Sequence, residues 1–341
     1  MTTTPPNGHR RRAHLRRVVL ITLTLLAALL TGAPLTAPVA HAADNGTWAV
    51  YPTPAAGAAP GSRTYFTLDS RPGAIIKDRV TIANLSDRPM TFRVYGADAY
   101  NTPRDGGFAL RGVDERQTDV GSWTKLTTGR VTVRAHSHTD LPFTLTIPAK
   151  ATPGDHSGAL VALDAAVEGT QKQGGLTVGI QRAVGARIYL HVKGPVRPGL
   201  AVEDLRIDRH TPTVPFTGSS SATIHYSLVN RGNTRLQPRF ELTATDLFGR
   251  TTLHIPSRNL ALTLMPGQHV ELTEPWPDAP QFGRHSLTLH VTTAGGSAQD
   301  TAHATLTIIP WLTVTLLLVL AAAAITLRRV RRRPRIHPET A

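Results

Sequence analysis

The stretch that decides the fold is residues 79–98, "RVTIANLSDRPMTFRVYGAD". Apolar and polar residues alternate in both halves, with Val80 and Ile82 in the first and Phe92 and Val94 in the second. This period of two predicts a pair of half-buried antiparallel strands. Asn84 heads the turn between them, because asparagine satisfies local backbone groups and tolerates left-handed conformations. We therefore expect the charged residues at 70–89, such as Lys77, Asp78 and Arg88, to lie on the solvent face and in the turn, as scaffold.

The same arrangement recurs at residues 222–246, "ATIHYSLVNRGNTRLQPRFELTATD", where Asn230 heads the turn. A second similarity links "TPGDHSGALVAL" at residues 152–163 with "QFGRHSLTLHV" at residues 281–291, since in both a glycine leads through His-Ser into an apolar run. Short alternating runs broken by Pro, Gly, Asn and Asp are typical of β-sandwiches. The sequence thus predicts an all-β fold of two tandem immunoglobulin-like β-sandwiches, at residues 63–194 and 195–305.

Both ends of the chain carry membrane-related signals. Arginines precede the apolar run at residues 18–30, and "AHA" follows it, so residues 1–42 are expected to be a signal peptide, exported by the Sec or the twin-arginine route. An Ala/Pro/Gly-rich leader is expected at residues 43–62. Residues 306–327 contain no ionisable side chain and predict one transmembrane helix. The arginine-rich residues 328–341 should stay cytoplasmic, which places the body outside the cell membrane.

Composition excludes several classes of function. The formal net charge is +14, but much of the excess arginine lies in the two terminal segments, and the part between them is close to balanced. There is consequently no case for a nucleic-acid partner. The chain has no cysteine, which excludes thiol chemistry and cysteine-ligated zinc.

No group of residues predicts catalysis, a metal site or a cofactor. Asp155, His156 and Ser157 are neighbours in one turn, whereas a hydrolytic triad needs residues that converge in space. His136 and His138 could share a strand face, but no third ligand stands at a convincing spacing. We expect a protein that is not an enzyme, with a cell-wall hydrolase as the disfavoured alternative.

The irregular segment at residues 98–125 is the candidate for ligand binding, because long insertions on a sandwich commonly carry function. Its candidate residues are Tyr100, Asn101, Phe108 and Trp123. The aromatic side chains could form a platform for sugar rings. Alternatively, Trp123 could fill the sandwich core, and the sequence leaves both possibilities open.

Residues 66–102, "FTLDSRPGAIIKDRVTIANLSDRPMTFRVYGADAYNT", resemble the N-terminal domain of the WxL-interacting proteins of Gram-positive bacteria. The similar features are Pro72-Gly73, the V-x-I-x-N-x-S run at residues 80–86 and the F-x-V-Y-x-x-D-A run at residues 92–99. "GSWTKL" at residues 121–126 and "RIYLHVKG" at residues 187–194 follow in the family's order. The resemblance implies a peptidoglycan-binding immunoglobulin-like domain and a membrane anchor. Residues 198–307 lack the family's second-domain pattern, so its host-protein binding is not expected here.

These observations predict a non-catalytic surface protein that binds peptidoglycan or a cell-wall-associated protein through its distal sandwich. The alternative is a spacer or an assembly partner that binds WxL-type or other surface proteins through exposed strand edges.

Overall fold

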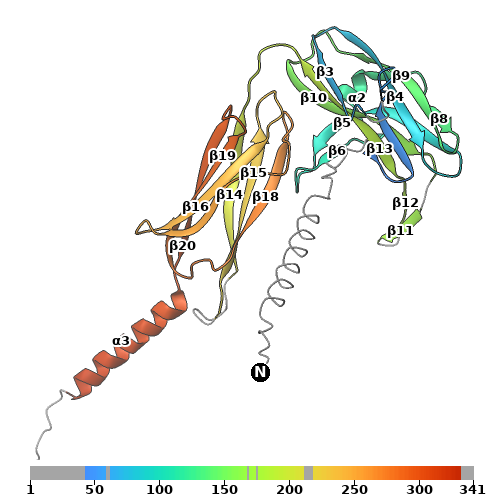
Figure 1. The fold of residues 1–341 in the computed structure, drawn as a ribbon. Coiled ribbons are helices and arrows are strands. Elements are labelled where there is room, and N and C mark those ends of the chain that lie inside the picture. The colour runs from blue at the N-terminus through green and yellow to red at the C-terminus, as the bar shows by residue number, and fades with distance from the viewer. Residues whose placement is uncertain (1–42, 59–61, 167–168, 174–175, 211–217, 332–341) are drawn as a thin grey trace, which may run out of the picture. The chain divides into compact units, whose positions relative to one another are not determined.

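The computed structural model describes residues 43–331, except 59–61, 167–168, 174–175 and 211–217 (Figure 1). The predicted signal peptide and most of the basic tail lie outside the described residues. All the described residues belong to one compact unit. The described part is built mainly of strands and ends in one long apolar helix, so the prediction of a β fold with a C-terminal helix is confirmed.

The first part of the chain forms two facing sheets, which we call the first sheet pair. One sheet has the strand order β1-β2-β4-β9-β7, and the other has the order β3-β13-β10-β5-β6, with β8 also paired to β5. The bounds are β1 Ala43–Asp44, β2 Trp48–Pro52, β3 Phe66–Ser70, β4 Ile75–Asn84, β5 Met90–Asn101, β6 Phe108–Leu110, β7 Thr124–Leu126, β8 Arg130–Val133, β9 Ser137–Thr146, β10 Gly154–Asp164 and β13 Ala183–Val192.

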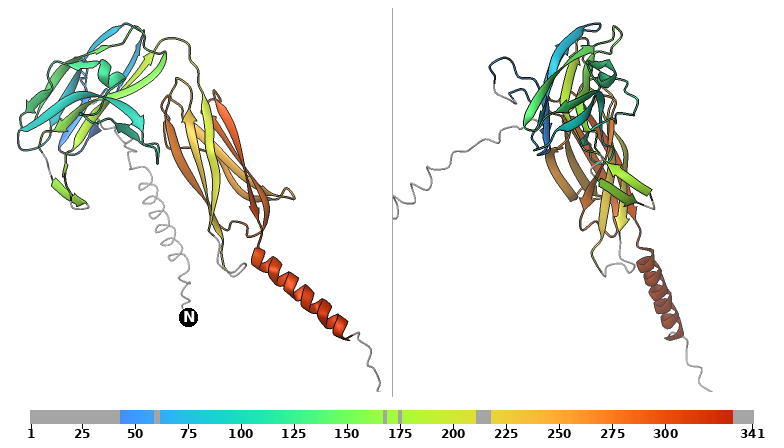
Figure 2. Two further views of the ribbon diagram at one scale, coloured as in Figure 1. Left: turned by 180° about the vertical axis from the view of Figure 1, so that it is seen from behind. Right: turned by 90° about the vertical axis from the view of Figure 1, so that its right-hand side faces the viewer.

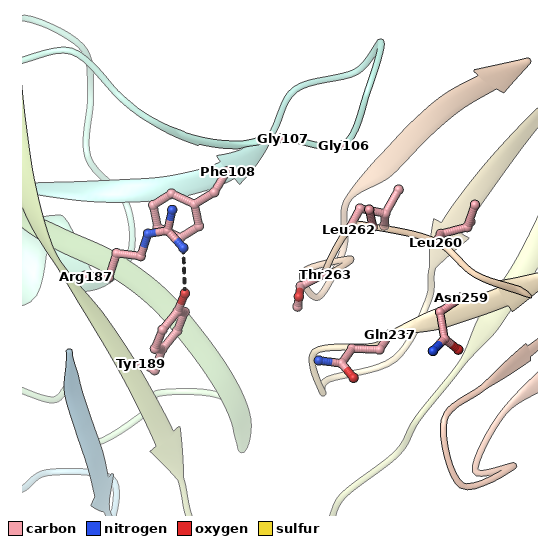
Figure 3. A pocket seen from close by; sticks show the side chains of 11 residues that line it. Gly106, Gly107, Phe108, Arg187, Tyr189, Gln237, Asn259, Leu260, Leu262 and Thr263 are labelled. Carbon is pink, nitrogen blue, oxygen red and sulfur yellow. Dashed lines mark hydrogen bonds between the residues drawn. The ribbon is translucent and has the colours of Figure 1, made fainter. Parts of the chain in front are cut away.

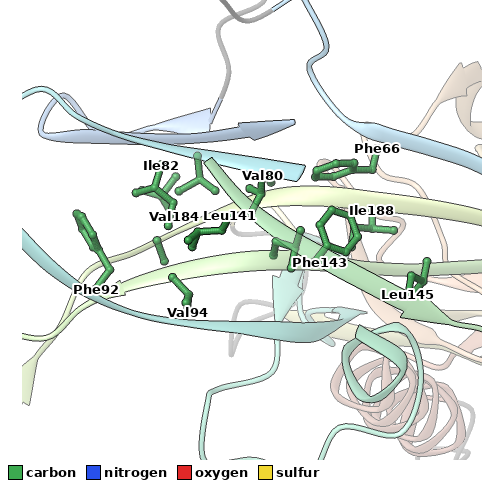
Figure 4. Packing of buried hydrophobic residues seen from close by; sticks show 14 of the residues in the cluster. Phe66, Val80, Ile82, Phe92, Val94, Leu141, Phe143, Leu145, Val184 and Ile188 are labelled. Carbon is green, nitrogen blue, oxygen red and sulfur yellow. The ribbon is translucent and has the colours of Figure 1, made fainter. Parts of the chain in front are cut away.

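A hydrophobic core fills the space between these two sheets (Figure 4). Its largest fully buried side chains include Trp48, Phe66, Phe92 and Phe143. The rings of Phe66 and Phe143, one from each sheet, pack edge to face with their centres 5.2 Å apart. Such aromatic contacts stabilise a fold beyond the area they bury, and the chain has no cysteine that could add a disulfide.

Two further strands, β11 (Gly169–Gln173) and β12 (Leu176–Ile180), pair only with each other (Figure 2). They form a hairpin apart from the two larger sheets, between β10 and β13 in the chain.

The later part of the chain forms the second sheet pair. Its sheets have the orders β14-β15-β18 and β17-β16-β19-β20 and enclose a separate core around Tyr226, Phe240 and Trp276. The bounds are β14 Leu200–His210, β15 Ser221–Asn230, β16 Pro238–Asp246, β17 Thr251–Asn259, β18 His269–Trp276, β19 Gly283–Thr293 and β20 Gln299–Ile308.

The two Asn-headed turns seen in the sequence are built alike. Asn84 is buried, its amide nitrogen donates to the carbonyls of Arg88, Val133 and Arg134, and its oxygen accepts from the backbone of Ser86. Asn230, also buried, donates in the same way to the carbonyls of Thr234 and Leu264 and accepts from Gly232. In each sheet pair one amide side chain thus bonds the end of one strand to a distant segment, as the repeated sequence pattern indicated.

Two boundaries differ from the sequence-based prediction. The leader expected at residues 43–62 contains β2, which pairs with β4 and buries Trp48 completely. The flanking prolines and alanines hide this short apolar strand in the sequence. The helix α3 spans Trp311–Arg331, because Leu306 and Ile308 at the start of the predicted membrane segment belong to β20. By length and composition α3 can cross a membrane.

Candidate functional site

The outer edge of β3 is an unpaired strand edge in the first sheet pair. β3 runs parallel to β13, its one neighbour in the sheet, with Phe66 opposite Ile188 and Ser70 opposite Val192. The carbonyl of Ser70 accepts from Lys193, so Ser70 faces β13. Backbone groups of a parallel strand alternate in direction. The N–H and C=O groups of Thr67 and Asp69 therefore point away from β13, and no described strand pairs with them.

Three outermost strands of the second sheet pair, β14, β17 and β18, carry features that disfavour the pairing of a further strand. β17 contains Pro256, and its register with β16 is broken twice. The backbone N–H of Val202 on β14 donates to the Asp300 carboxylate on β20, which links these two strands. On β18, the N–H of Glu271 donates to the carbonyl of Pro103. Proline, irregular register and covering contacts are the usual means of preventing edge pairing.

Beside β3 lies a group of side chains that we call the aromatic–arginine cluster: Tyr65, Phe108, Arg187 and Tyr189. The Arg187 guanidinium lies 4.2 Å from the centre of the Phe108 ring and 5.8 Å from that of Tyr65. Its Nη1 donates to the hydroxyl of Tyr189 at 3.3 Å. Arg187 and Tyr189 alternate with the core residues Ile188 and Leu190, so they stand on the outer face of the sheet.

Arg187 is half-buried, and no described carboxylate forms an ion pair with it. A partly desolvated charge without an opposite charge is costly unless a ligand supplies one. A cavity of about 440 Å³ opens beside it, lined by the rings of Phe108 and Tyr189 and by polar groups such as Gln237 and Asn259 (Figure 3). The arrangement suits an anionic group carried on an apolar or extended ligand.

A second guanidinium extends the cluster. Arg235 lies 4.3 Å from the centre of the Tyr189 ring. Its backbone N–H donates to the Asp155 carboxylate, whose other oxygen bonds the ring of His191 at 2.8 Å. Asp155 is thus engaged by His191 and Arg235 and leaves Arg187 available to a ligand.

Of the four residues predicted as a binding site, Asn101 and Phe108 lie opposite each other on β5 and β6, with Tyr100 beside them, but their side chains have different partners. Phe108 belongs to the aromatic–arginine cluster. Tyr100 instead meets the guanidinium of Arg111, 6.0 Å from the ring centre. Asn101 is buried, donating to the carbonyls of Gly106 and Thr263 and accepting from the backbone of Met265. With both ends of its side chain bonded, Asn101 serves the fold.

Trp123 closes the short helix α2 (Val120–Trp123) and packs against the first core. Its ring lies 4.9 Å from that of His156. Both ring nitrogens of His156 face acceptors: Nδ1 is 2.8 Å from the Asp119 carboxylate and Nε2 is 2.9 Å from the Thr152 carbonyl. The sequence left open whether Trp123 fills the core or forms a platform for sugar rings, and this placement favours a role in the core.

The His156 contacts predict a pH-dependent stability. Burial lowers the pKa of His156, but the hydrogen bond and charge of Asp119, with the Thr152 carbonyl and Asp155, outweigh burial and raise the pKa overall. A raised folded-state pKa stabilises the fold below the unfolded value of about 6.5, and this contribution is lost as pH rises through the folded value. We expect denaturant midpoints to fall as pH rises above about 6.5 and this fall to shrink in His156→Gln. The exposed His138→Gln control should behave like the wild type; an identical pH profile for His156→Gln would contradict the assignment.

Asp155, His156 and Ser157 lie in the strand β10 and not in the turn that the sequence suggested, and their side chains have different surroundings. Asp155 bonds His191, and His156 bonds Asp119. The buried Ser157 hydroxyl has no hydrogen-bond partner among the described residues. Among all the described residues, no three His, Asp or Glu side chains lie close enough together to hold a metal ion.

No protein-family model and no curated protein matches the chain. Among solved structures, it is similar to a chaperone–tip adhesin complex of CFA/I fimbriae, at 9% identity and a TM-score of 0.34, over 77% of this chain and 99% of the other. It is also similar to the CsuC–CsuE chaperone–tip adhesion subunit complex of Acinetobacter baumannii Csu pili, at 10% identity and a TM-score of 0.36, over 75% and 97% of the two chains. The Salmonella enterica SafA pilin–SafB chaperone complex matches at 10% identity and a TM-score of 0.29, over 78% and 99%. These scores lie below 0.5 and are no basis for assigning a function.

Proposed function

We propose that this chain is a membrane-anchored, non-enzymatic surface protein that binds a partner protein by strand addition at the outer edge of β3. In this proposal α3 is the anchor, and each sheet pair is an immunoglobulin-type sandwich outside the membrane. The observation that carries the proposal is the outward direction of the Thr67 and Asp69 backbone groups, which no strand of the described residues receives.

Strand addition would satisfy these groups. A partner segment in extended conformation supplies matching C=O and N–H groups, and its alternate side chains fall on one face of the sheet. That face carries the aromatic–arginine cluster, where an acidic side chain of the partner could pair with Arg187 and an apolar one could pack on Tyr65. Main-chain bonds would give affinity and the cluster would give selectivity.

Peptidoglycan binding, the principal prediction from the sequence, has less support. Asn101 and Trp123, on which it partly depended, are engaged in hydrogen bonds and packing inside the fold. The aromatic–arginine cluster also lies on the outer face of the sheet, on β13 and one strand away from the free edge of β3, a position that suits the side chains of an added extended polypeptide.

The proposal is tested by affinity capture with the detergent-solubilised full-length chain. Thr67→Pro removes an outward N–H without touching the bonds to β13, and Thr67→Val retains that N–H. Wild type and Thr67→Val should capture the same surface protein in similar amounts. Thr67→Pro should capture at least about tenfold less of it, although its melting temperature equals that of the wild type. Equal retention by all three chains would contradict the proposal. Sedimentation of all three with insoluble peptidoglycan, without any protein partner, would instead favour wall-polymer binding.

A further inference from the structure

The turn between β16 and β17 presents two large apolar side chains outward. Leu247 and Phe248 are 72% and 82% exposed. The turn is held firmly: one Asp246 carboxylate oxygen accepts from the backbone of Phe248 and Arg250, and Gly249 takes the positive φ that the turn requires. A rigid turn that exposes leucine and phenylalanine needs a binding partner to explain it.

Strand register places this turn near the start of the membrane helix. Asp246 at the end of β16 lies opposite His285 on β19, and Gly283 at the start of β19 lies opposite Ile308 on β20 (Figure 1). Neighbouring strands are about 4.8 Å apart, so β16 lies only about 10 Å from β20. The turn therefore sits at the end of the sheet from which the chain enters α3.

Further exposed apolar residues gather at this end. Phe282 precedes β19, and Ile309 and Trp311 link β20 to α3; all three are more than half exposed. Arg250 and Arg284 lie at the same level and are exposed. Aromatic and apolar side chains with flanking arginines are typical of the boundary between lipid tails and headgroups.

We propose that the Leu247–Phe248 turn inserts into the membrane surface beside α3, so that the second sheet pair rests on the bilayer. The occupant is lipid because the turn lies at the same end of the sheet as the segment that leads into α3. This contact would fix the direction in which the first sheet pair is presented. The inference rests on the anchor role of α3 in the proposed function, and it is independent of strand addition at β3.

The absence of native cysteine allows a direct test with the full-length chain in phosphatidylcholine nanodiscs. A fluorophore is attached to Cys in Thr251→Cys, next to the turn, and quenching by a shallow lipid-borne nitroxide is measured. We expect quenching at least about threefold stronger than for Ala294→Cys, which lies at the opposite end of the sheet. Adding Phe248→Glu should reduce the Thr251 signal to the Ala294 level.

A third label separates failure of the inference from failure of the anchor. Leu318→Cys, in the middle of α3, should be quenched by a deep nitroxide. Deep quenching at 318 with no shallow quenching at 251 would overturn the membrane contact and leave the anchor intact. Loss of both signals would show that α3 does not insert, which contradicts the anchor and with it this inference. A nanodisc containing anionic lipid should increase the Thr251 signal if Arg250 and Arg284 contact headgroups.

Discussion

Replacement of Asn84 by alanine should lower the free energy of unfolding of the first sheet pair by about 3 kcal/mol, because three buried or partly buried carbonyls are left without this donor. The Asn84 amide donates to three carbonyls, those of Arg88, Val133 and Arg134, at 2.7, 3.1 and 3.1 Å. Asn84→Asp keeps the shape but cannot donate, so we expect a loss of similar size. Denaturant unfolding followed by fluorescence of Trp48, which pairs with Asn84 across β2 and β4, measures both changes.

The matched control is Arg88→Ala, an exposed position in the same turn. It should change the free energy of unfolding by less than about 0.5 kcal/mol, as surface substitutions usually do. If Asn84→Ala were as mild as Arg88→Ala, the turn would not depend on the asparagine, and the likeness to Asn230 would have no structural meaning.

The second large effect is expected at Asp98, a buried carboxylate on β5 at the start of the irregular segment. It accepts hydrogen bonds from the backbone N–H groups of Thr118, Asp119 and Gly121. An amide in its place offers one acceptor oxygen and turns an NH₂ group toward N–H donors. We expect Asp98→Asn to destabilise the fold by about 2–4 kcal/mol, since hydrogen bonds to a buried charge are strong and their loss is costly.

Limited trypsin digestion reports this change locally. Cleavage after Arg111 and Arg116 should become much faster in Asp98→Asn, because the segment before α2 loses its anchor. Asp114→Asn is the control, since that carboxylate is largely exposed and makes one long ion pair with Arg93. Equal cleavage rates for the wild type and Asp98→Asn would contradict the role assigned to Asp98.

Much of the fold could be predicted because its signals are local. The alternation of Val80 and Ile82 with polar residues, and the Asn84 turn, are visible in a short window. β2 was missed because its few apolar residues are surrounded by proline and alanine. The parallel pairing of β3 with β13 joins segments far apart in sequence, and no local pattern predicts such a pairing.

The candidate site could be predicted only in part for the same reason. Aromatic content drew attention to Phe108, but its partner Arg187 comes from a distant strand. Asn101 was expected to bind a ligand, whereas its side chain bonds the connection between β5 and β6 to a loop of the second sheet pair. One signal was available: Arg187 and Tyr189 alternate with apolar residues along β13, which already placed them on the outer face.

Site-specific photo-crosslinking at Thr67 tests the central claim most directly. The full-length chain, with a photoreactive phenylalanine analogue at position 67, is expressed in cells of the organism that encodes it. Cross-linked products are then identified by mass spectrometry. The account predicts one protein cross-linked at Thr67, lost on adding Asp69→Pro, and no such product from the exposed Thr146 on the opposite sheet. Cross-linking to glycan alone, or a protein product that survives Asp69→Pro, would contradict strand addition at β3.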